Sequence, residues 1–153
     1  MPNARVHRTV GTIVGGGVTL LATKELPDEG RAAAVLGGLL GGYVGGALPD
    51  VLEPAIHSWH RSACHSGAAG TALIASLRSA TQLKNDTLSH AAELRAKRLA
   101  LPVNHPDRFL LGLQELLLYV TYGAAIGFAA GYTSHLVLDM GTERGIPLIC
   151  RGL

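Results

Sequence analysis

The chain has few charged residues, few aromatic residues and only two cysteines among its 153 positions. Asp, Glu, Lys and Arg make up 16% of the residues, whereas soluble domains carry about 25%. Cys64 and Cys150 are too few to indicate a disulfide framework. The net charge of +2 is too small to indicate a nucleic-acid partner, and none is expected. No segment sustains the alternation of apolar and polar residues that is typical of strands, so we expect an all-α fold.

Glycine and apolar side chains make up most of what is present. Hydrophobic residues account for 48% of the chain and glycine for 20 positions. Four uncharged stretches cover residues 9–23, 32–49, 66–77 and 116–134. A membrane-spanning helix needs about 20 apolar residues, with a range of about 17–25, so the second and fourth stretches qualify, the first is marginal and the third is short. The alternative is a buried helical bundle in a soluble protein.

The second stretch favours the membrane because of its glycines. In water, each glycine in a helix interior costs roughly 1 kcal/mol relative to alanine, whereas small residues let membrane helices approach closely. Pro49 is predicted to end this helix, since proline cannot continue the hydrogen-bond ladder. The glycines form three overlapping GxxxG pairs, namely Gly38–Gly42, Gly41–Gly45 and Gly42–Gly46.

Residues 79–108 are polar, rich in alanine and basic. Their middle part is predicted to be an amphipathic helix that ends before Pro102 and Pro106, and a solvated hairpin between two core helices is favoured. The alternative is contact with a membrane surface through Arg95, Lys97 and Arg98. We therefore expect residues 1–153 to form one domain, a small all-α bundle of about four apolar helices, embedded in a membrane, with this polar helical insert.

The first candidate for chemistry is "PDVLEPAIHSWHRSACHS", residues 49–66, which holds three of the seven histidines. His57 and His60 would share one face of a helix, but His65 would lie on another. A break near Arg61 would let His60 and His65 face a common centre. Imidazoles with nearby carboxylates suit zinc or a similar divalent ion. The alternative is an ordinary polar loop at an interface with water.

A second candidate lies near the C-terminus, where His135 and Asp139 are four residues apart. On a helix both side chains would lie on one face, so both could bind one cation. A helix that carries this pair by chance is the alternative.

Chain topology predicts that these groups lie at the same end of the bundle. If each apolar stretch crosses the membrane once, a residue before the first crossing lies on the same side as residues after the second and the fourth crossings. The same parity holds for the two ends of a soluble four-helix bundle. The residues that can then meet are His7, Asp50, His60, His65, His135 and Asp139.

Several motifs in this order resemble a known family. "LPD", "HRSACHS", "GYTSHLVLD" and "GTERGIPL", together with an early histidine, are similar to the motifs of bacterial inner-membrane, LexA-binding metal-dependent hydrolases. The resemblance runs from His7 to about Leu148. Cys64 stands where the family usually has threonine, and Glu53 or His57 takes the place of its usual acidic or histidine residue after the "PD".

The resemblance implies a multi-pass protein of the bacterial inner (cytoplasmic) membrane. The His/Asp pattern of the family is similar to that of zinc-dependent phospholipase C, so Zn²⁺ or another divalent metal, as one or more ions, is the implied cofactor. A phosphoester or lipid-like ester is the implied substrate, and membrane lipid is the expected surrounding partner. The implied metal ligands are His7, Asp50, His60, His65, His135 and Asp139.

These residues suggest metal-assisted hydrolysis, in which a bound divalent ion makes water nucleophilic near neutral pH. Asp50 is the candidate for bridging a metal or orienting the water. Arg61 is placed either to neutralise a phosphate by bidentate hydrogen bonds or to anchor the chain among lipid headgroups.

Two functions of other classes remain open. The same ligands could bind a structural metal in a non-catalytic membrane protein, which would act through another protein or a second copy of the chain. A transporter is the third alternative, because histidine and aspartate inside a membrane can mark an ion path. Open coordination would indicate catalysis, whereas four protein ligands would indicate a structural zinc.

Overall fold

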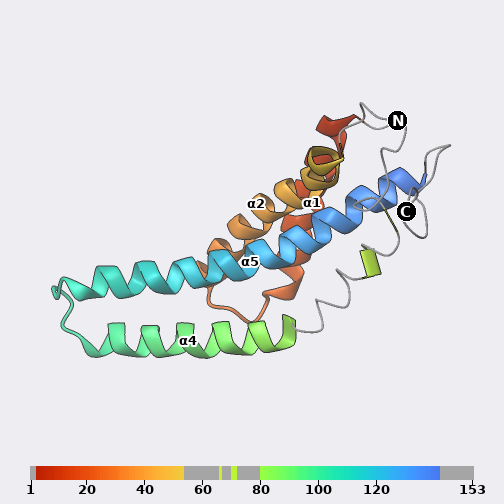
Figure 1. Ribbon diagram of the computed structural model, residues 1–153. Coiled ribbons are helices and arrows are strands. Elements are labelled where there is room, and N and C mark those ends of the chain that lie inside the picture. The colour runs from red at the N-terminus through yellow and green to blue at the C-terminus, as the bar shows by residue number, and fades with distance from the viewer. Residues whose placement is uncertain (1–2, 54–65, 67–69, 72–79, 142–153) are drawn as a thin grey trace.

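The computed structural model describes residues 3–53, 66, 70–71 and 80–141 (Figure 1). Within these residues the chain is helical and contains no strand, so the all-α prediction is confirmed. The long helices are α1 (Ala4–Ala22), α2 (Asp28–Leu52), α4 (Ala80–Ala100) and α5 (Asp107–Met140).

Two of these helices, α2 and α5, are long and apolar enough to cross a membrane. The first apolar stretch forms α1, which does not join them as a candidate span. Most of the third stretch, residues 66–77, lies outside the described residues. That the chain crosses the membrane four times therefore stays a prediction.

The helix ends follow from local chemistry. At the start of α1, the side-chain Oδ1 of Asn3 accepts a hydrogen bond from the backbone N–H of Val6 at 3.1 Å, which caps the helix. Asp28 and Glu29 occupy the first turn of α2, where negative charge complements the helix dipole. The helix predicted within the insert is confirmed, because α4 ends at Ala100, before Pro102.

Pro49 does not end α2, so that prediction was wrong. The helix continues to Leu52, and the backbone N–H of Glu53 still bonds to the carbonyl of Pro49 at 2.9 Å. Proline removes one backbone donor and crowds the carbonyl four residues earlier. At this position the loss falls in the last turn, so only a few residues follow it. The consequence is that Asp50 extends from a helix and not from a loop.

The helices are arranged as two groups along α5 (Figure 1). The helices α1 and α2 lie against the C-terminal part of α5, and α4 runs beside its N-terminal part. At 1.5 Å per residue, the 34 residues of α5 extend about 51 Å, more than the roughly 30 Å of a hydrocarbon core. The start of α1 and the ends of α2 and α5 meet at one end of the bundle.

Glycine lets the three apolar helices touch through their backbones. One face of α2 meets α1, where a Cβ on Gly42 would overlap the carbonyl oxygen of Gly11. The adjacent face meets α5, where a Cβ on Gly41 would overlap the carbonyl oxygen of Ala124. Because both overlaps are with backbone atoms, neither can be relieved by a side-chain rotation. The GxxxG pairs thus give α2 two packing faces, as expected for small residues between membrane helices.

The contact between α4 and α5 is of another kind. Ala91 and Leu94 of α4 are buried, whereas Leu99 is 59% exposed. A guanidinium nitrogen of Arg98 donates to a carboxylate oxygen of Glu115 at 2.9 Å, and Glu115 is buried. Side chains, and not bare backbone, hold this helix in place.

Candidate metal centre

Three polar side chains are buried where the helix ends meet. His7 lies in the first turn of α1, and His135 and Asp139 lie in the last two turns of α5. Their exposed fractions are 2%, 0% and 1%. Buried imidazole and carboxylate groups are expensive unless they pair or bind a metal.

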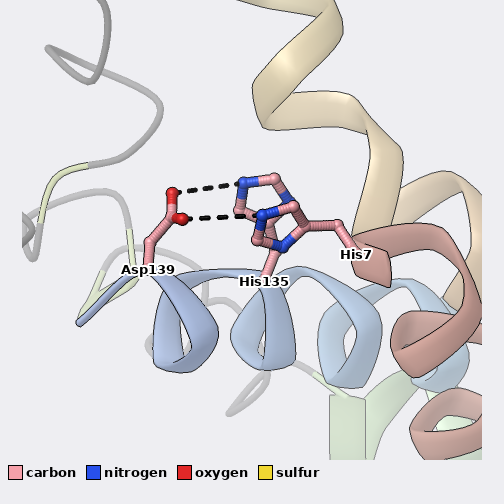
Figure 2. A group of neighbouring side chains, drawn as sticks. All are labelled: His7, His135 and Asp139. Atoms are coloured by element: carbon pink, nitrogen blue, oxygen red, sulfur yellow. Dashed lines mark ion pairs between the residues drawn. The ribbon is translucent and has the colours of Figure 1, made fainter. Parts of the chain in front are cut away.

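Figure 2 shows how the three side chains converge. Nε2 of His7 lies 3.5 Å from Oδ1 of Asp139, and Nε2 of His135 lies 3.6 Å from Oδ2 of Asp139. One ligand atom from each residue can be chosen so that all lie within 4.8 Å of one another. The two imidazole rings stack with centroids 3.8 Å apart. The group could therefore hold a metal ion.

The orientation of His135 is set by α2. Its Nδ1 lies 2.8 Å from the carbonyl oxygen of Gly46, and since a carbonyl can only accept, Nδ1 carries the proton and donates. In the neutral ring the lone pair is then on Nε2, which faces the carboxylate of Asp139. A ligating histidine usually has its second nitrogen held in this way. The donor set and its orientation fit a divalent cation.

Gly46 has a second role at the same place. A Cβ on this residue would lie 2.5 Å from the carbonyl oxygen of His7, so only glycine lets α1 approach α2 here. Its carbonyl then reaches His135 on α5. From the sequence, Gly46 is predicted only as a packing residue. The signal was the GxxxG pair that it forms with Gly42, which gives packing but not the bond to an imidazole.

Asp50 lies at the edge of the buried group. Its Oδ1 is 3.6 Å from Nε2 of His135, and its side chain is 24% exposed. It follows Gly46 by one helical turn on α2, which places both beside the end of α5. The structure therefore brings together four of the six residues expected as ligands, His7, Asp50, His135 and Asp139.

The other expected site residues lie outside the described residues. They are His60 and His65 among the ligands and Arg61 as the phosphate-binding residue, with His57 and Cys64 beside them. Their roles stay predictions. The chain is described up to Glu53, three residues after Asp50.

Residues 1–150 match the family model described as YdjM inner membrane protein, so the chain belongs to that family. No curated protein and no solved structure matches the chain. The inner-membrane part of the expected identity is thereby confirmed.

Proposed function

We propose that this member of the YdjM inner membrane protein family is a membrane-bound, metal-dependent hydrolase that acts on a phosphoester or a lipid-like ester. One observation carries the proposal. Three buried ligand groups, His7, His135 and Asp139, converge, and a partly exposed carboxylate, Asp50, stands beside them. A catalytic metal site commonly has three protein ligands and one position open to water or substrate.

His7, His135 and Asp139 would hold the ion, and zinc is the natural candidate because it accepts imidazole nitrogen and carboxylate oxygen. The chemistry that such an ion supplies is polarisation of an ester oxygen and acidification of a bound water. His60 and His65 are proposed as further ligands, which would allow more than one ion.

The remaining steps belong to residues of the chain. Asp50 would orient the attacking water and accept its proton. This role is supported by the position of its carboxylate, which lies beside Nε2 of His135 and is reached by solvent. Gly46 keeps His135 in the tautomer whose Nε2 lone pair points inward. Arg61 is proposed to bind the phosphate oxygens. At the end of a membrane bundle, such a site would lie near lipid headgroups.

Metal content tests the first part of the proposal. Wild-type protein purified without chelators should carry stoichiometric metal, and His135→Ala should lose it. The matched control is His90→Ala, since His90 is an exposed histidine of α4. Wild-type protein that carries no metal would contradict the proposal.

Hydrolysis tests the second part. Asp50→Asn should retain metal, because three buried ligands remain, and should cleave a water-soluble aryl phosphodiester more slowly by about 100-fold or more. Asp107→Asn, at the far end of α5, is the control and should cleave at the wild-type rate. Equal rates in Asp50→Asn and wild type would remove Asp50 from the reaction.

The second candidate function is a structural metal that joins α1 to α5. The burial of all three central ligands to 2% exposure or less favours it, because a structural site excludes water. In that case the protein would act through a partner and not by cleavage. Tightly bound metal without hydrolysis of any phosphoester would support this candidate over the first.

A further inference from the structure

A groove of about 550 Å³ runs between α1 and α5. Its α1 wall is the stripe Val10, Val14 and Val18, and its α5 wall is one face between residues 126 and 138. The valines are four residues apart, so they lie on one face of the helix. Ala129 and Ala130 have small side chains, which leave space between α5 and α1. We call this feature the α1–α5 groove.

The walls of the α1–α5 groove are mostly apolar side chains. Two of its lining residues are polar, Thr133 and Ser134. Their hydroxyls donate to carbonyls of their own helix, that of Ala129 at 2.8 Å and that of Gly131 at 2.7 Å. The volume is in the range of small-molecule sites, about 300–1,000 Å³. An apolar ligand without hydrogen-bonding groups fits this lining.

One end of the groove lies beside the candidate metal centre. Val10 is three residues after His7 on α1, and Leu138 directly precedes Asp139 on α5. The residues of the α5 wall extend over about 18 Å at 1.5 Å per residue. One leaflet of a bilayer has about 15 Å of hydrocarbon, half of a roughly 30 Å core. The groove therefore has the length of one leaflet and ends at the polar group.

We infer that the α1–α5 groove binds an acyl chain of a membrane phospholipid and thereby places the headgroup ester of that lipid at the metal centre. The inference rests on the proposed function and names its substrate class. The position, length and apolar lining of the groove fit this occupant, since a phospholipid combines an acyl chain of leaflet length with an ester at its polar end. Leu36, Leu40 and Val44 of α2 are also half exposed, but they line no part of the groove.

Two matched substitutions test the inference. Val14→Phe places a ring in the middle of the groove, whereas Val44→Phe makes the same change on a half-exposed site of α2 outside it. Each protein is purified in mild detergent, and retained phospholipid is measured by native mass spectrometry. Wild type and Val44→Phe should retain a phospholipid, and Val14→Phe should retain about tenfold less, because an overfilled apolar site loses its ligand. Metal content, which should not change, reports that both variants fold.

A second measurement locates the bound acyl chain within the groove. A phosphatidylglycerol with a diazirine at the end of one acyl chain is added to the delipidated protein and photolysed. Labels should concentrate near Val18 and Ile126, the groove end farthest from the metal centre, and should fall in Val14→Phe but not in Val44→Phe. Equal loss in both variants, or no retained lipid in wild type, would overturn the inference. A change of oligomeric state in Val14→Phe without any lipid would assign the groove to a second copy of the chain instead.

Cleavage separates this inference from the proposed function. Val14→Phe should cleave a water-soluble phosphodiester at the wild-type rate and lose cleavage of a long-chain phospholipid. Unchanged phospholipid cleavage by Val14→Phe would contradict the assignment of the groove to the substrate site. If wild type binds no metal and cleaves neither compound, the proposed function fails, and the assignment of the retained lipid as a substrate fails with it. Lipid retention by wild type but not by Val14→Phe would then still place an acyl chain in the groove.

Discussion

Two parts of α5 are held by different means, and we call them its halves. The C-terminal half, residues 120–140, lies against α1 and α2, and the N-terminal half, residues 107–119, lies beside α4 (Figure 1). The C-terminal half contacts α1 and α2 through backbone atoms, for example where Gly131 meets the carbonyl of Gly42. The N-terminal half contacts α4 through side chains, including the ion pair of Arg98 with Glu115. Backbone contacts leave no adjustable atoms between the helices, so they place His7, His135 and Asp139 rigidly. Side-chain contacts can adjust, so the α4 end should tolerate substitutions that the other end does not.

The largest expected effect comes from Gly46→Ala. Its Cβ would press on the backbone of His7 and displace both α1 and the carbonyl that holds His135. We expect a loss of roughly 3 kcal/mol or more in the free energy of unfolding, together with loss of metal, as for overpacking in a core without room to adjust. Thermal unfolding in detergent and metal analysis measure both.

Gly17→Ala is the matched control, because nothing lies within 4 Å of a Cβ built on Gly17. This substitution should stabilise α1 by up to about 1 kcal/mol through better helix propensity. If the two alanine variants unfold at the same temperature, backbone packing does not hold the metal end together.

Removal of the proposed metal should have the next largest effect. An ion that binds only the folded protein, at a free concentration 100 times its Kd, stabilises it by about 2.7 kcal/mol. A strong chelator should therefore lower the unfolding temperature of wild type and leave that of His7→Ala unchanged. Hydrogen exchange should increase at the start of α1 and the end of α5 but not in α4. An equal shift in both proteins would mean that the chelator acts elsewhere.

Glu115→Gln should have a smaller effect, confined to the other half of α5. The substitution removes the charge that pairs with Arg98, where a charge-assisted hydrogen bond is worth about 1.5–3 kcal/mol. Metal content and hydrolysis should remain those of wild type. Glu93→Gln, at an exposed position of α4, is the control and should change stability little. Metal loss in Glu115→Gln would show that the two halves are coupled.

The smallest expected effect is that of Lys84→Ala. Nζ of Lys84 lies 3.9 Å from a carboxylate oxygen of Glu25, and the Glu25 side chain is 88% exposed. Exposed ion pairs of this kind contribute up to about 1 kcal/mol, and often nothing measurable. The unfolding temperature should move little, and the shift should disappear at high salt. A loss as large as that of Glu115→Gln would make this contact a main support of α4.

The sequence predicted the local parts of the site well. His135 and Asp139 were expected on one helical face because they are four residues apart, and α5 presents both to the same centre. Parity of the apolar stretches predicted that His7 and Asp50 would lie at the same end, and the structure places them there. Pro49 misled the prediction because the helix penalty of proline is an average, and one missing bond in a final turn is tolerated.

Residue pattern and spacing by themselves determined the helical class, the glycine faces of α2 and the pairing of His135 with Asp139, because all three depend on neighbours within a turn or two. Only the tertiary structure decided that the carbonyl of Gly46 orients His135 and that the His7 ring stacks on it. These contacts join three helices that are far apart in the chain. Their formation depends on which row of glycines in α2 faces α1 and which faces α5. Helical periodicity shows that the rows exist but not which helix packs against each row.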